Sequence, residues 1–561
     1  MTEDIDQGIV KRFRPDQVNE ALVELGSATT LIGQNILGYD LPALKKLFNF
    51  EYKGEILDTL LLSRLANPNR PMHPRCPTKV WDEHSGKDKA VGPHTLMNLG
   101  YYAGLLKGDF GESAGWEEFS EEMLDYCEQD VLVTTQVFRY LLKELQGFSP
   151  KCIELEHQFG ARIQQQMQNG WYFNIDKAYE LEAELLEKMM DLESVVQDTF
   201  KPLAKQGRLI QPRSKKDGTL SSVGLKYIDR YQDKVPVPDS VEGRYGVEYT
   251  SGSFTRIDWP EFNLGSRQQI SEQLIFRGWK PKERTEKGSV IVNEKVLKGI
   301  DRKFKEAALL ADYFMISKKK SMVSSWIENY NQDTGRIHGY VNTLGAGTRR
   351  CTHSGPNVAQ VPASKSTKEG KLIFGFEGGY GADCRQLFTV PSGYKQVGCD
   401  ASGLELRMLA HYMNDAIYTD LILNGDIHTY NQKAAGLPTR NDAKTFIYAF
   451  LYGAGDAKIG SIVGGSSKAG KKLKAEFLNS LPALKKLKDA VGMAAQRGWV
   501  KSIDGSKIRI RSEHAALNFL LQSAGAIVMK QWLVFVCEQA DLEGLDYKAV
   551  GNIHKYCGEH Q

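Results

Sequence analysis

The stretch that decides the interpretation of this 561-residue chain is Arg440-Asn-Asp-Ala-Lys444-Thr-Phe-Ile-Tyr448-Ala-Phe-Leu-Tyr452-Gly-Ala-Gly. On a helix, each step of four residues climbs about 6 Å and turns about 40° past a full circle. Arg440, Lys444 and Tyr448 are therefore predicted to lie in a row on one face. Such a row could bind a triphosphate and then a base, because arginine matches phosphate oxygens and lysine adds a mobile charge. The commoner meaning of the pattern is a solvated basic face with core tyrosines.

A second informative stretch lies upstream, at Val397-Gly-Cys-Asp400-Ala-Ser-Gly-Leu-Glu405. The residues before Asp400 predict a buried strand end, and Leu404, Met408 and Leu409 have the apolar spacing of a helix. An aspartate between a strand and a helix is well placed to hold Mg²⁺ against a substrate phosphate. A single aspartate in such a turn is more often only a helix cap.

Length and composition indicate an ordinary globular protein of several domains. The chain is too long for one core, and its 41% hydrophobic and 25% charged residues are typical values. The net charge of +3 argues neither for nor against nucleic acid, because a local basic cleft is what binds phosphates. Basic clusters at residues 318–320 and 468–474 are equally consistent with exposed helix faces.

The eight cysteines include no Cys-x-x-Cys pair, so a reducing compartment is expected rather than a disulfide framework. His73-Pro-Arg-Cys76 has no second pair at zinc spacing and is interpreted as a loop. There is no run of about 18 apolar residues and no signal-like start. We therefore expect a cytoplasmic protein with no membrane partner, in the host cell cytoplasm if the chain is phage-encoded.

Together the two stretches resemble motifs A and B of the family-A DNA polymerases, most closely the podophage, T-seven-like replicative branch. Ordered matches at residues 335–341, 352–362, 384–388 and 514–525 extend the resemblance over nearly the whole chain. The implied fold is mixed α/β (α+β): an exonuclease-like domain of ribonuclease H type, followed by a right-hand polymerase. The implied domains are residues 1–150 (exonuclease-like), 151–330 (thumb, with an insert at about 204–262), 331–425 (palm), 426–510 (fingers) and 511–561 (palm remainder).

The resemblance implies that the nucleotide is bound in a two-metal Mg²⁺ site. Asp400 and the Ala401 carbonyl would hold the metals. Lys444 would protonate or stabilise the departing pyrophosphate. Glu405 would hydrogen-bond Tyr448 and exclude a ribose 2′-OH, and a tyrosine at 448 predicts tolerance of dideoxynucleotides. The implied nucleotide-binding residues are Ala401, Glu405, His428, Arg440, Lys444 and Tyr448.

The resemblance also implies contacts to a primer-template. Minor-groove acceptors are similar in all base pairs, so one polar side chain can check any correct pair. Tyr452 would stack near the template base. The implied DNA-binding residues are Arg350, Asn357, Gln360, Arg385, Tyr452, Gln522 and His554.

The N-terminal region contains a second candidate site. Residues 31–44 predict strand, loop and helix, with Asp40 at the helix start as a natural cap. A helix from Glu121 places Tyr126 and Asp130 on one face. Asp40, Tyr126 and Asp130 resemble three residues of the DEDDy 3′–5′ exonucleases, but the Asp-x-Glu motif of their first strand is missing. Glu3-Asp4 lacks a hydrophobic strand, so we expect little or no proofreading.

The thumb region is predicted to be helical over about 151–200 and again over about 266–329. Between them, residues 204–262 are rich in Gly, Pro, Lys, Tyr and Ser and show no long periodic run. The phage branch carries a thumb insert at a comparable place, which captures a processivity partner. We expect this insert to contact DNA or such a partner rather than to act as a spacer.

The chain departs from the family at its third polymerase motif, His-Asp-Glu. It reads His554-Lys555, so an ammonium stands where a metal-bridging carboxylate is expected. Glu559 is a conceivable substitute. Both ends fall inside catalytic motifs, and a frame break, an intron or a split gene with a complementary C-terminal polypeptide is expected.

Three functions follow from these patterns. The first is a DNA-directed DNA polymerase that extends a primer from dNTPs in phage DNA replication, with a vestigial exonuclease. The second is an inactive primer-template and dNTP-binding fragment, or one half of a split polymerase. The third, an exonuclease without polymerase function, is disfavoured by the missing Asp-x-Glu.

Overall fold

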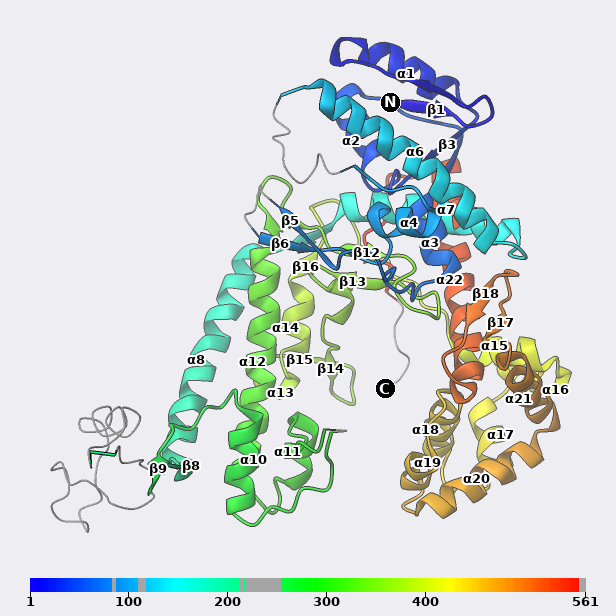
Figure 1. The fold of residues 1–561 in the computed structure, drawn as a ribbon. Helices are drawn as coiled ribbons and strands as arrows, with labels where there is room; N and C mark the ends of the chain where they lie inside the picture. Colours follow the sequence, from blue (N-terminus) through cyan, green and yellow to red (C-terminus); the bar gives the residue numbers. More distant parts are fainter. Residues whose placement is uncertain (83–86, 109–117, 211–215, 218–253, 286, 554–561) are drawn as a thin grey trace. The chain divides into compact units, whose positions relative to one another are not determined.

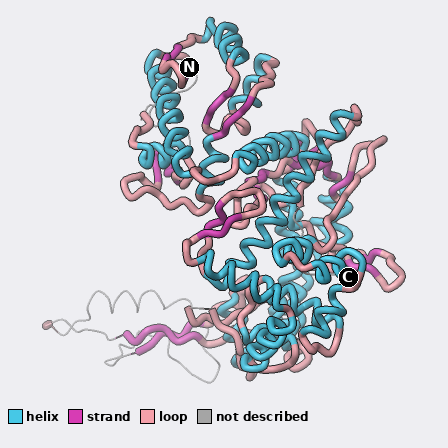
Figure 2. The backbone as a smooth tube through the Cα atoms, turned by 90° about the vertical axis from the view of Figure 1, so that its right-hand side faces the viewer, coloured by secondary structure: helices cyan, strands magenta, loops and turns pink. Residues whose placement is uncertain are grey.

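The computed structural model describes residues 1–82, 87–108, 118–210, 216–217, 254–285 and 287–553. The chain divides into two units. The first comprises Met1–Phe173, Asn329–Val361 and Phe388–Gln561, and the second comprises Asn174–Glu328 and Pro362–Leu387. Figures 1 and 2 show that both are rich in helices. Each unit is described by itself below.

The first unit begins with an α/β region. A parallel strand pair, β3 with β4, and helix α3 lie against the long helix α6, whose buried face joins Leu62, Leu65, Leu99 and Val137 in one core. The elements are β1 (Thr2–Asp4), β2 (Ile9–Lys11), η1 (Pro15–Gln17), α1 (Val18–Ser27), β3 (Thr30–Gly33), α2 (Asp40–Phe48), β4 (Glu55–Asp58), α3 (Thr59–Ala66), β5 (Lys79–Asp82), β6 (Lys87–Ala90), α4 (Leu96–Ala103) and α6 (Glu121–Glu144). The predicted strand, loop and helix at residues 31–44 and the helix at Glu121 are confirmed.

A small antiparallel sheet follows, in the order β10-β11-β7-β16. Its centre is β7, which a sharp turn at Gly170 separates from α7. Gly170 has φ +61°, and a Cβ there would lie 2.7 Å from the His338 ring, so only glycine fits. This turn interrupts the helix predicted over 151–200. The elements are α7 (Pro150–Asn169), β7 (Trp171–Phe173), β10 (Tyr330–Asn331), β11 (Arg336–Ile337), β12 (Tyr340–Asn342), β13 (Thr352–Ser354), η2 (Val358–Gln360) and β16 (Phe388–Thr389).

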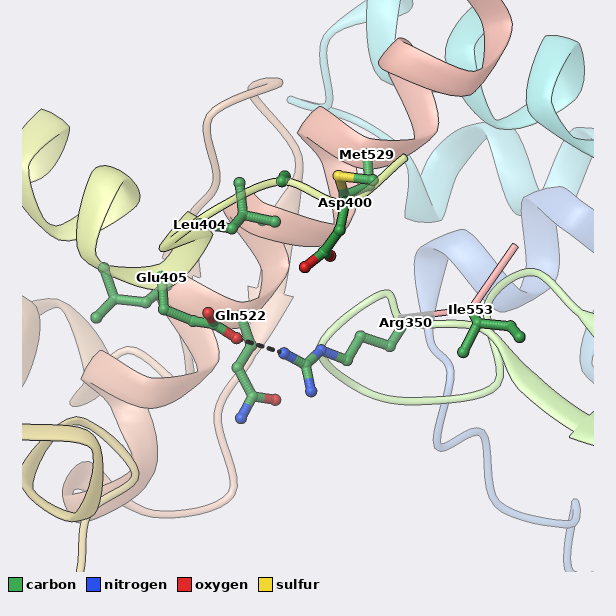
Figure 3. Close-up of a pocket in the computed structure, with 10 residues that line it drawn as sticks. Arg350, Asp400, Leu404, Glu405, Gln522, Met529 and Ile553 are labelled. Carbon is green, nitrogen blue, oxygen red and sulfur yellow. Dashed lines mark hydrogen bonds and ion pairs between the residues drawn. The ribbon is translucent and has the colours of Figure 1, made fainter. Parts of the chain in front are cut away.

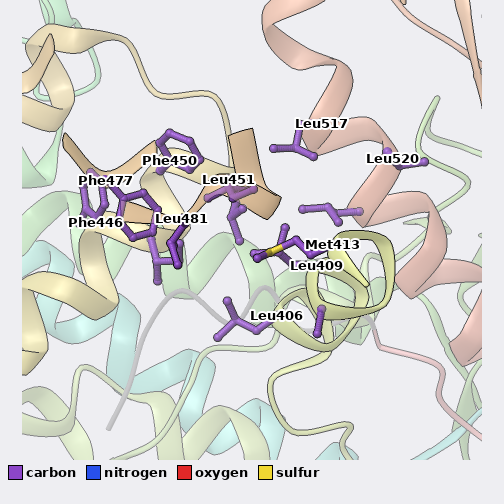
Figure 4. Packing of buried hydrophobic residues seen from close by; sticks show 14 of the residues in the cluster. Leu406, Leu409, Met413, Phe446, Phe450, Leu451, Phe477, Leu481, Leu517 and Leu520 are labelled. Atoms are coloured by element: carbon purple, nitrogen blue, oxygen red, sulfur yellow. The ribbon is translucent and has the colours of Figure 1, made fainter. Parts of the chain in front are cut away.

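A bundle of helices completes the first unit around the largest apolar cluster (Figure 4). The cluster includes Leu406, Leu409, Phe446, Phe450 and Phe477. The elements are α15 (Leu404–Met413), α16 (Ala416–Asn424), α17 (Ile427–Ala434), α18 (Arg440–Leu451), α19 (Asp456–Ile462), α20 (Ser467–Ser480), α21 (Pro482–Ala495), β17 (Trp499–Lys501), β18 (Lys507–Arg509), η3 (Glu513–Ala515) and α22 (Ala516–Leu542). The helix predicted from Leu404 is confirmed.

Helix α22 is a long central helix around which other helices of this unit pack. Within the described residues, the segment Glu513–Leu542 is long and apolar enough to cross a membrane by length and composition, and 56% of its most apolar window is buried inside the protein. It packs against α7 and α15, and its Lys530 is fully buried against Glu156 of α7. These contacts are those of a core helix.

The second unit is built on α8 and α12, which pack along each other. Its core contains Phe200, Phe262, Trp279 and Leu310. The single helix predicted over 266–329 is three helices. Residues 277–285 and 287–293 form a loop with a bridge between Arg284 and Val290, and residues 301–305 form a turn before the third helix. The elements are α8 (Ile175–Thr199), β8 (Lys205–Ile210), β9 (Phe254–Asp258), α10 (Arg267–Phe276), α11 (Glu294–Ile300), α12 (Glu306–Glu328), β14 (Lys365–Ser366), β15 (Leu372–Ile373), α13 (Gly375–Gly378) and α14 (Gly381–Gln386). Strands β8 and β9 pair with each other at the ends of the insert, most of which lies outside the described residues.

The buried strand end predicted before Asp400 is wrong. Residues 390–400 contain no strand, and Val397 is 84% exposed. A strand needs a hydrogen-bonded neighbour, and no described segment pairs with these residues. Asp400 therefore lies in an exposed loop.

Candidate nucleotidyl-transfer site

A pocket in the first unit gathers the residues around Asp400 (Figure 3). Asp400, Ala401, Leu404 and Glu405 line it from the loop and the start of α15. Gln522 and Met529 line it from α22, and Arg350 enters from the segment before β13. The side chains of Asp400, Glu405, Arg350 and Gln522 point toward the same space. The structure thus brings together five of the predicted site residues, namely Asp400, Ala401, Glu405, Arg350 and Gln522.

Local sequence explains how Asp400 and Glu405 come to face one pocket. Gly403 has φ +61°, a conformation that suits glycine, and it ends the loop just before α15 begins at Leu404. Glu405 then falls in the first turn of the helix, where a carboxylate is favoured by the helix dipole. Asp400 stays exposed, whereas Glu405 is buried.

Glu405 is held by a cation and a phenol. Arg350 Nη2 donates to Glu405 Oε1 at 3.1 Å, and the Tyr452 hydroxyl donates to the same oxygen at 3.3 Å. The predicted partner of Glu405 was Tyr448, and the hydrogen bond seen in the structure comes from Tyr452, one helical turn farther along α18. Tyr448 instead stacks on Tyr452, with ring centroids 6.3 Å apart, and lies 6.3 Å from the His428 ring.

The row on α18 is confirmed as a helix face. Thr439 caps the helix by accepting from the Asp442 N–H. Ala443, Phe446, Ile447 and Phe450 point into the core, so Arg440 and Lys444 are left exposed. Because the apolar residues fix the rotation of the helix, its basic face is turned outward.

Helix α17 adds two residues to this face. Asp426 caps α17 and also accepts two hydrogen bonds from Arg440, at 2.8 and 3.1 Å. Arg440 is the first cause of a strongly lowered pKa of Asp426. The pKa of His428 is lowered by burial and by the charges of Arg440 and Lys444, so its imidazole is neutral at pH 7. His428, Arg440, Lys444 and Tyr448 therefore form one cluster, and Asp426 is a member that the sequence did not assign.

The other predicted DNA contacts are not among the residues that line the pocket. Asn357 precedes η2, and its buried Oδ1 has no hydrogen-bond partner among the described residues. Gln360 is exposed at the end of η2. Arg385 belongs to the second unit, where its Nε donates to the Pro362 carbonyl at 2.8 Å. His554, Lys555 and Glu559 lie outside the described residues.

A buried ionic cluster beneath the pocket was not predicted. Lys530 Nζ lies 2.8 and 2.7 Å from the two oxygens of Glu156, and Arg349 Nη1 lies 3.7 Å from Glu156 Oε1. Arg349 has φ +63° and directly precedes Arg350. The signal in the sequence is a single lysine inside the apolar stretch Ala526-Ile-Val-Met-Lys530-Gln-Trp-Leu-Val.

The donor set around Asp400 fits a divalent metal that substrate phosphates help to hold. Mg²⁺ is commonly bound by one or two carboxylates together with phosphate oxygens, and the pocket offers the exposed Asp400 carboxylate beside Ala401. Glu405 is engaged by Arg350 and Tyr452. Over the described ranges, no group of three or more His, Cys, Asp or Glu residues is arranged to hold a metal by itself.

In the N-terminal region, the side chains of Tyr126 and Asp130 both contact Lys107. Lys107 Nζ lies 2.9 Å from Asp130 and 4.8 Å from the centroid of the Tyr126 ring. Burial raises the pKa of Asp130, while Lys107 opposes that shift. Lys107 thus pairs with Asp130 Oδ2, whereas the buried Asp130 Oδ1 has no hydrogen-bond partner among the described residues.

Two details of the exonuclease prediction are corrected. Asp40 is the first residue of α2 rather than its cap, which is Tyr39, and burial followed by the Asp58 charge raises the pKa of Asp40. Glu3 and Asp4 do lie on a strand, β1, because β2 pairs with it. Their side chains serve local contacts: Glu3 accepts from the Thr135 hydroxyl, and Asp4 accepts from the N–H groups of the following turn.

Comparison with known proteins finds similar sequences and a similar fold. The profile described as DNA polymerase family A matches residues 247–555. The DNA-directed DNA polymerase of Escherichia phage T7 is 34% identical, over 95% of this chain and 86% of its own length. That of Enterobacteria phage T3 is 33% identical, over 97% and 88%. A solved structure, the POL domain of Pol1 from M. smegmatis in complex with DNA primer-template and dNTP, is similar in fold with a TM-score of 0.67 at 16% identity, covering 97% of this chain and 82% of that one.

Proposed function

Since this chain belongs to DNA polymerase family A and is a DNA-directed DNA polymerase, we propose that the Asp400 pocket and the α17–α18 face together form its nucleotidyl-transfer site. The observation that carries the proposal is Glu405, which accepts from Arg350 of the pocket and from Tyr452 at the end of α18. One buried carboxylate thus links the two clusters. A nucleotide bound along α18 would place its reacting phosphate near Asp400.

The exposed row supports the binding of an incoming dNTP. Arg440 and Lys444 carry the charges that a triphosphate needs, and His428 adds a polar ring beside them. Tyr448 offers an aromatic face for the sugar and base. Lys444 is our candidate to stabilise the departing pyrophosphate, because it is mobile and exposed on the same face.

Divalent metal is general in this family, and we propose that Mg²⁺ binds at Asp400 and the Ala401 carbonyl. When bound there, the metal would neutralise phosphate charge and favour attack by the primer 3′-hydroxyl. Asp400 would anchor it, and Arg350 would keep Glu405 from competing for it. The second metal of a two-metal site needs a further carboxylate, and the other carboxylate among the described lining residues, Glu405, is engaged by Arg350 and Tyr452.

We also propose that the primer-template lies against Arg350 and Gln522 in the pocket, with Tyr452 beside the template base. Asn357 supports this role, because a buried amide oxygen without a described partner is suited to a ligand donor. Gln360, Arg385 and His554 are proposed contacts by resemblance alone. The insert at 204–262 is proposed to contact DNA or to bind a processivity partner. The protein is proposed to act in the cytoplasm of the host cell.

Primer extension tests the function directly. The purified chain is mixed with a labelled primer-template, dNTPs and Mg²⁺, and extended products are measured. Addition of bases supports the proposed function. An active form should also incorporate dideoxynucleotides readily, and their strong rejection would count against the role of Tyr448.

A second candidate function is primer-template and dNTP binding without extension. One observation favours it. Among the described residues that line the pocket, Asp400 is the one carboxylate that is not engaged by another side chain, and a single carboxylate would hold a catalytic metal weakly. Binding measured by fluorescence anisotropy, with no extension, supports this candidate. Extension that appears only after a C-terminal segment carrying the Asp-Glu motif is supplied would identify a complementary polypeptide as partner.

The exonuclease-like region is proposed to have little or no proofreading activity. The ion pair between Lys107 and Asp130 supports this, because it neutralises a carboxylate that a metal would otherwise use. Degradation of single-stranded DNA with Mg²⁺ that is lost in Asp40→Ala would overturn it.

A further inference from the structure

The contact between Asp426 and Arg440 uses the same atoms that a phosphate would use. Arg440 Nε donates to Asp426 Oδ2 at 2.8 Å, and Nη2 donates to Oδ1 at 3.1 Å. Two parallel N–H···O bonds from one guanidinium are the geometry by which arginine binds carboxylate and phosphate alike. While this pair is closed, two of the donors of Arg440 cannot serve a nucleotide.

The pair is weak enough to be exchanged. The side chains of Arg440 and Asp426 are 51% and 44% exposed, and exposed ion pairs contribute little and are screened by salt. Lys444, one turn along the same face, has no ion-pair partner within the described ranges. A polyanion can therefore approach Lys444 first and compete for Arg440 from there.

Asp426 is itself fixed in place by its role at the start of α17. Its carboxylate accepts from the N–H groups of His428 and Thr429 at 3.1 and 3.3 Å, and from the Thr429 hydroxyl at 2.7 Å. These bonds do not depend on Arg440. The carboxylate is thus retained at the helix start when the guanidinium leaves, so it is available to take Arg440 back after the ligand departs.

We propose that Asp426 is a positioning residue, a reversible latch that holds Arg440 until a triphosphate displaces it. The inference rests on the proposed nucleotide-binding role of the α18 row. The closed pair lowers the affinity of any phosphate ligand that needs Arg440 by the fraction of time for which the pair is open. A ligand with several adjacent charges still binds usefully, because Lys444 attracts it independently of Arg440.

Helix capping provides a matched control. Asp415 caps α16 as Asp426 caps α17, accepting from the N–H groups of Ile417 and Tyr418 at 3.0 Å each. Asp415 has no arginine partner among the described residues. Because asparagine caps a helix as well as aspartate does, Asp426→Asn and Asp415→Asn both keep the cap, and only the former releases Arg440.

The test is calorimetric titration of the full chain with tripolyphosphate, which carries no sugar or base. We expect Asp426→Asn to bind it roughly fivefold more tightly than the unsubstituted protein, and orthophosphate affinity to rise as well. Asp415→Asn should bind unchanged, and Asp426→Glu, which keeps the charge, should return toward the original affinity. In primer extension, Asp426→Asn should lower KM for dNTP while kcat is retained.

Two results overturn the latch. Equal or weaker tripolyphosphate binding by Asp426→Asn would mean that Asp426 only caps α17 or helps the ligand. Tripolyphosphate binding by none of the proteins would refute both the latch and the triphosphate role of the row. Primer extension judges the proposed polymerase function separately, so the two failures are distinguishable.

Discussion

The α17–α18 face and the loop before Asp400, the two regions of the candidate site, are held in place by different interactions. The hydrogen bonds of α18 lie within the helix, and its apolar positions alone fix which face looks outward. The loop at 390–400 has no internal bonds of that kind, and no strand among the described residues pairs with it. A local pattern therefore predicts where Arg440 and Lys444 lie, whereas the position of Asp400 depends on the rest of the fold.

The largest effect is expected at the loop, with Asp400→Asn. An amide cannot supply the charge that anchors a divalent metal, which contributes several kcal/mol to stabilising the transition state. Primer extension should fall on the order of a thousandfold or more. Single-turnover extension under saturating primer-template and dNTP measures it.

The control for this prediction is Ser402→Ala, an exposed neighbour in the same loop, which should extend normally. Primer-template affinity should be unchanged in both proteins. An Asp400→Asn enzyme with ordinary activity would show that the loop carries no metal anchor and that the α18 face alone was correctly interpreted.

This contrast explains what could be predicted from the sequence. Helix starts and faces followed from local spacing, as at Leu404, Glu121 and Arg440. Strand pairing at Val397 and the break at Gly170 did not, because each depends on residues far along the chain. The bond from Tyr452 to Glu405 was not predicted, since a family pattern names a residue type and the packing decides which tyrosine of α18 reaches the carboxylate. The Glu156–Lys530 pair joins positions 374 apart, which no local pattern reveals.

The next effect, of about 4 kcal/mol in the free energy of unfolding, is expected for Lys530→Met. The substitution leaves the buried Glu156 carboxylate with only Arg349, 3.7 Å away. Since α22 also supplies Gln522 and Met529 to the pocket, the change tests whether the core beneath the loop sets its geometry. Urea unfolding followed by tryptophan fluorescence measures the loss.

The paired control is the double substitution Glu156→Gln with Lys530→Met. Removing both charges should recover most of the lost stability, because no unpaired carboxylate remains buried. A single substitution that costs less than about 1 kcal/mol would show that water reaches the cluster and that the pocket floor is less rigid than its burial indicates.

A smaller effect, about a hundredfold in kcat, is expected for Lys444→Met. Methionine keeps the length of the side chain and removes the charge that would stabilise the departing pyrophosphate. Lys433→Met, on α17 outside the row, is the control and should act normally. If Lys444→Met and Lys433→Met have the same kcat, Lys444 has no specific part in the chemical step. The basic face of α18 would then act only by attracting DNA through its charge.

The smallest effect is expected where the two regions touch. Tyr452→Phe removes a hydroxyl that donates to Glu405, but Arg350 still holds that carboxylate. Loss of one such bond contributes about 1 kcal/mol, so KM for dNTP should rise roughly fivefold. The companion substitution is Tyr448→Phe, which keeps the aromatic ring and leaves the bond between Tyr452 and Glu405 intact. A larger rise at Tyr448 than at Tyr452 would mean that α18 turns when nucleotide binds, so that the pairing predicted from sequence describes the working state. Equal and negligible effects would mean that Arg350 alone holds Glu405 in place, and that the helix and the loop act independently.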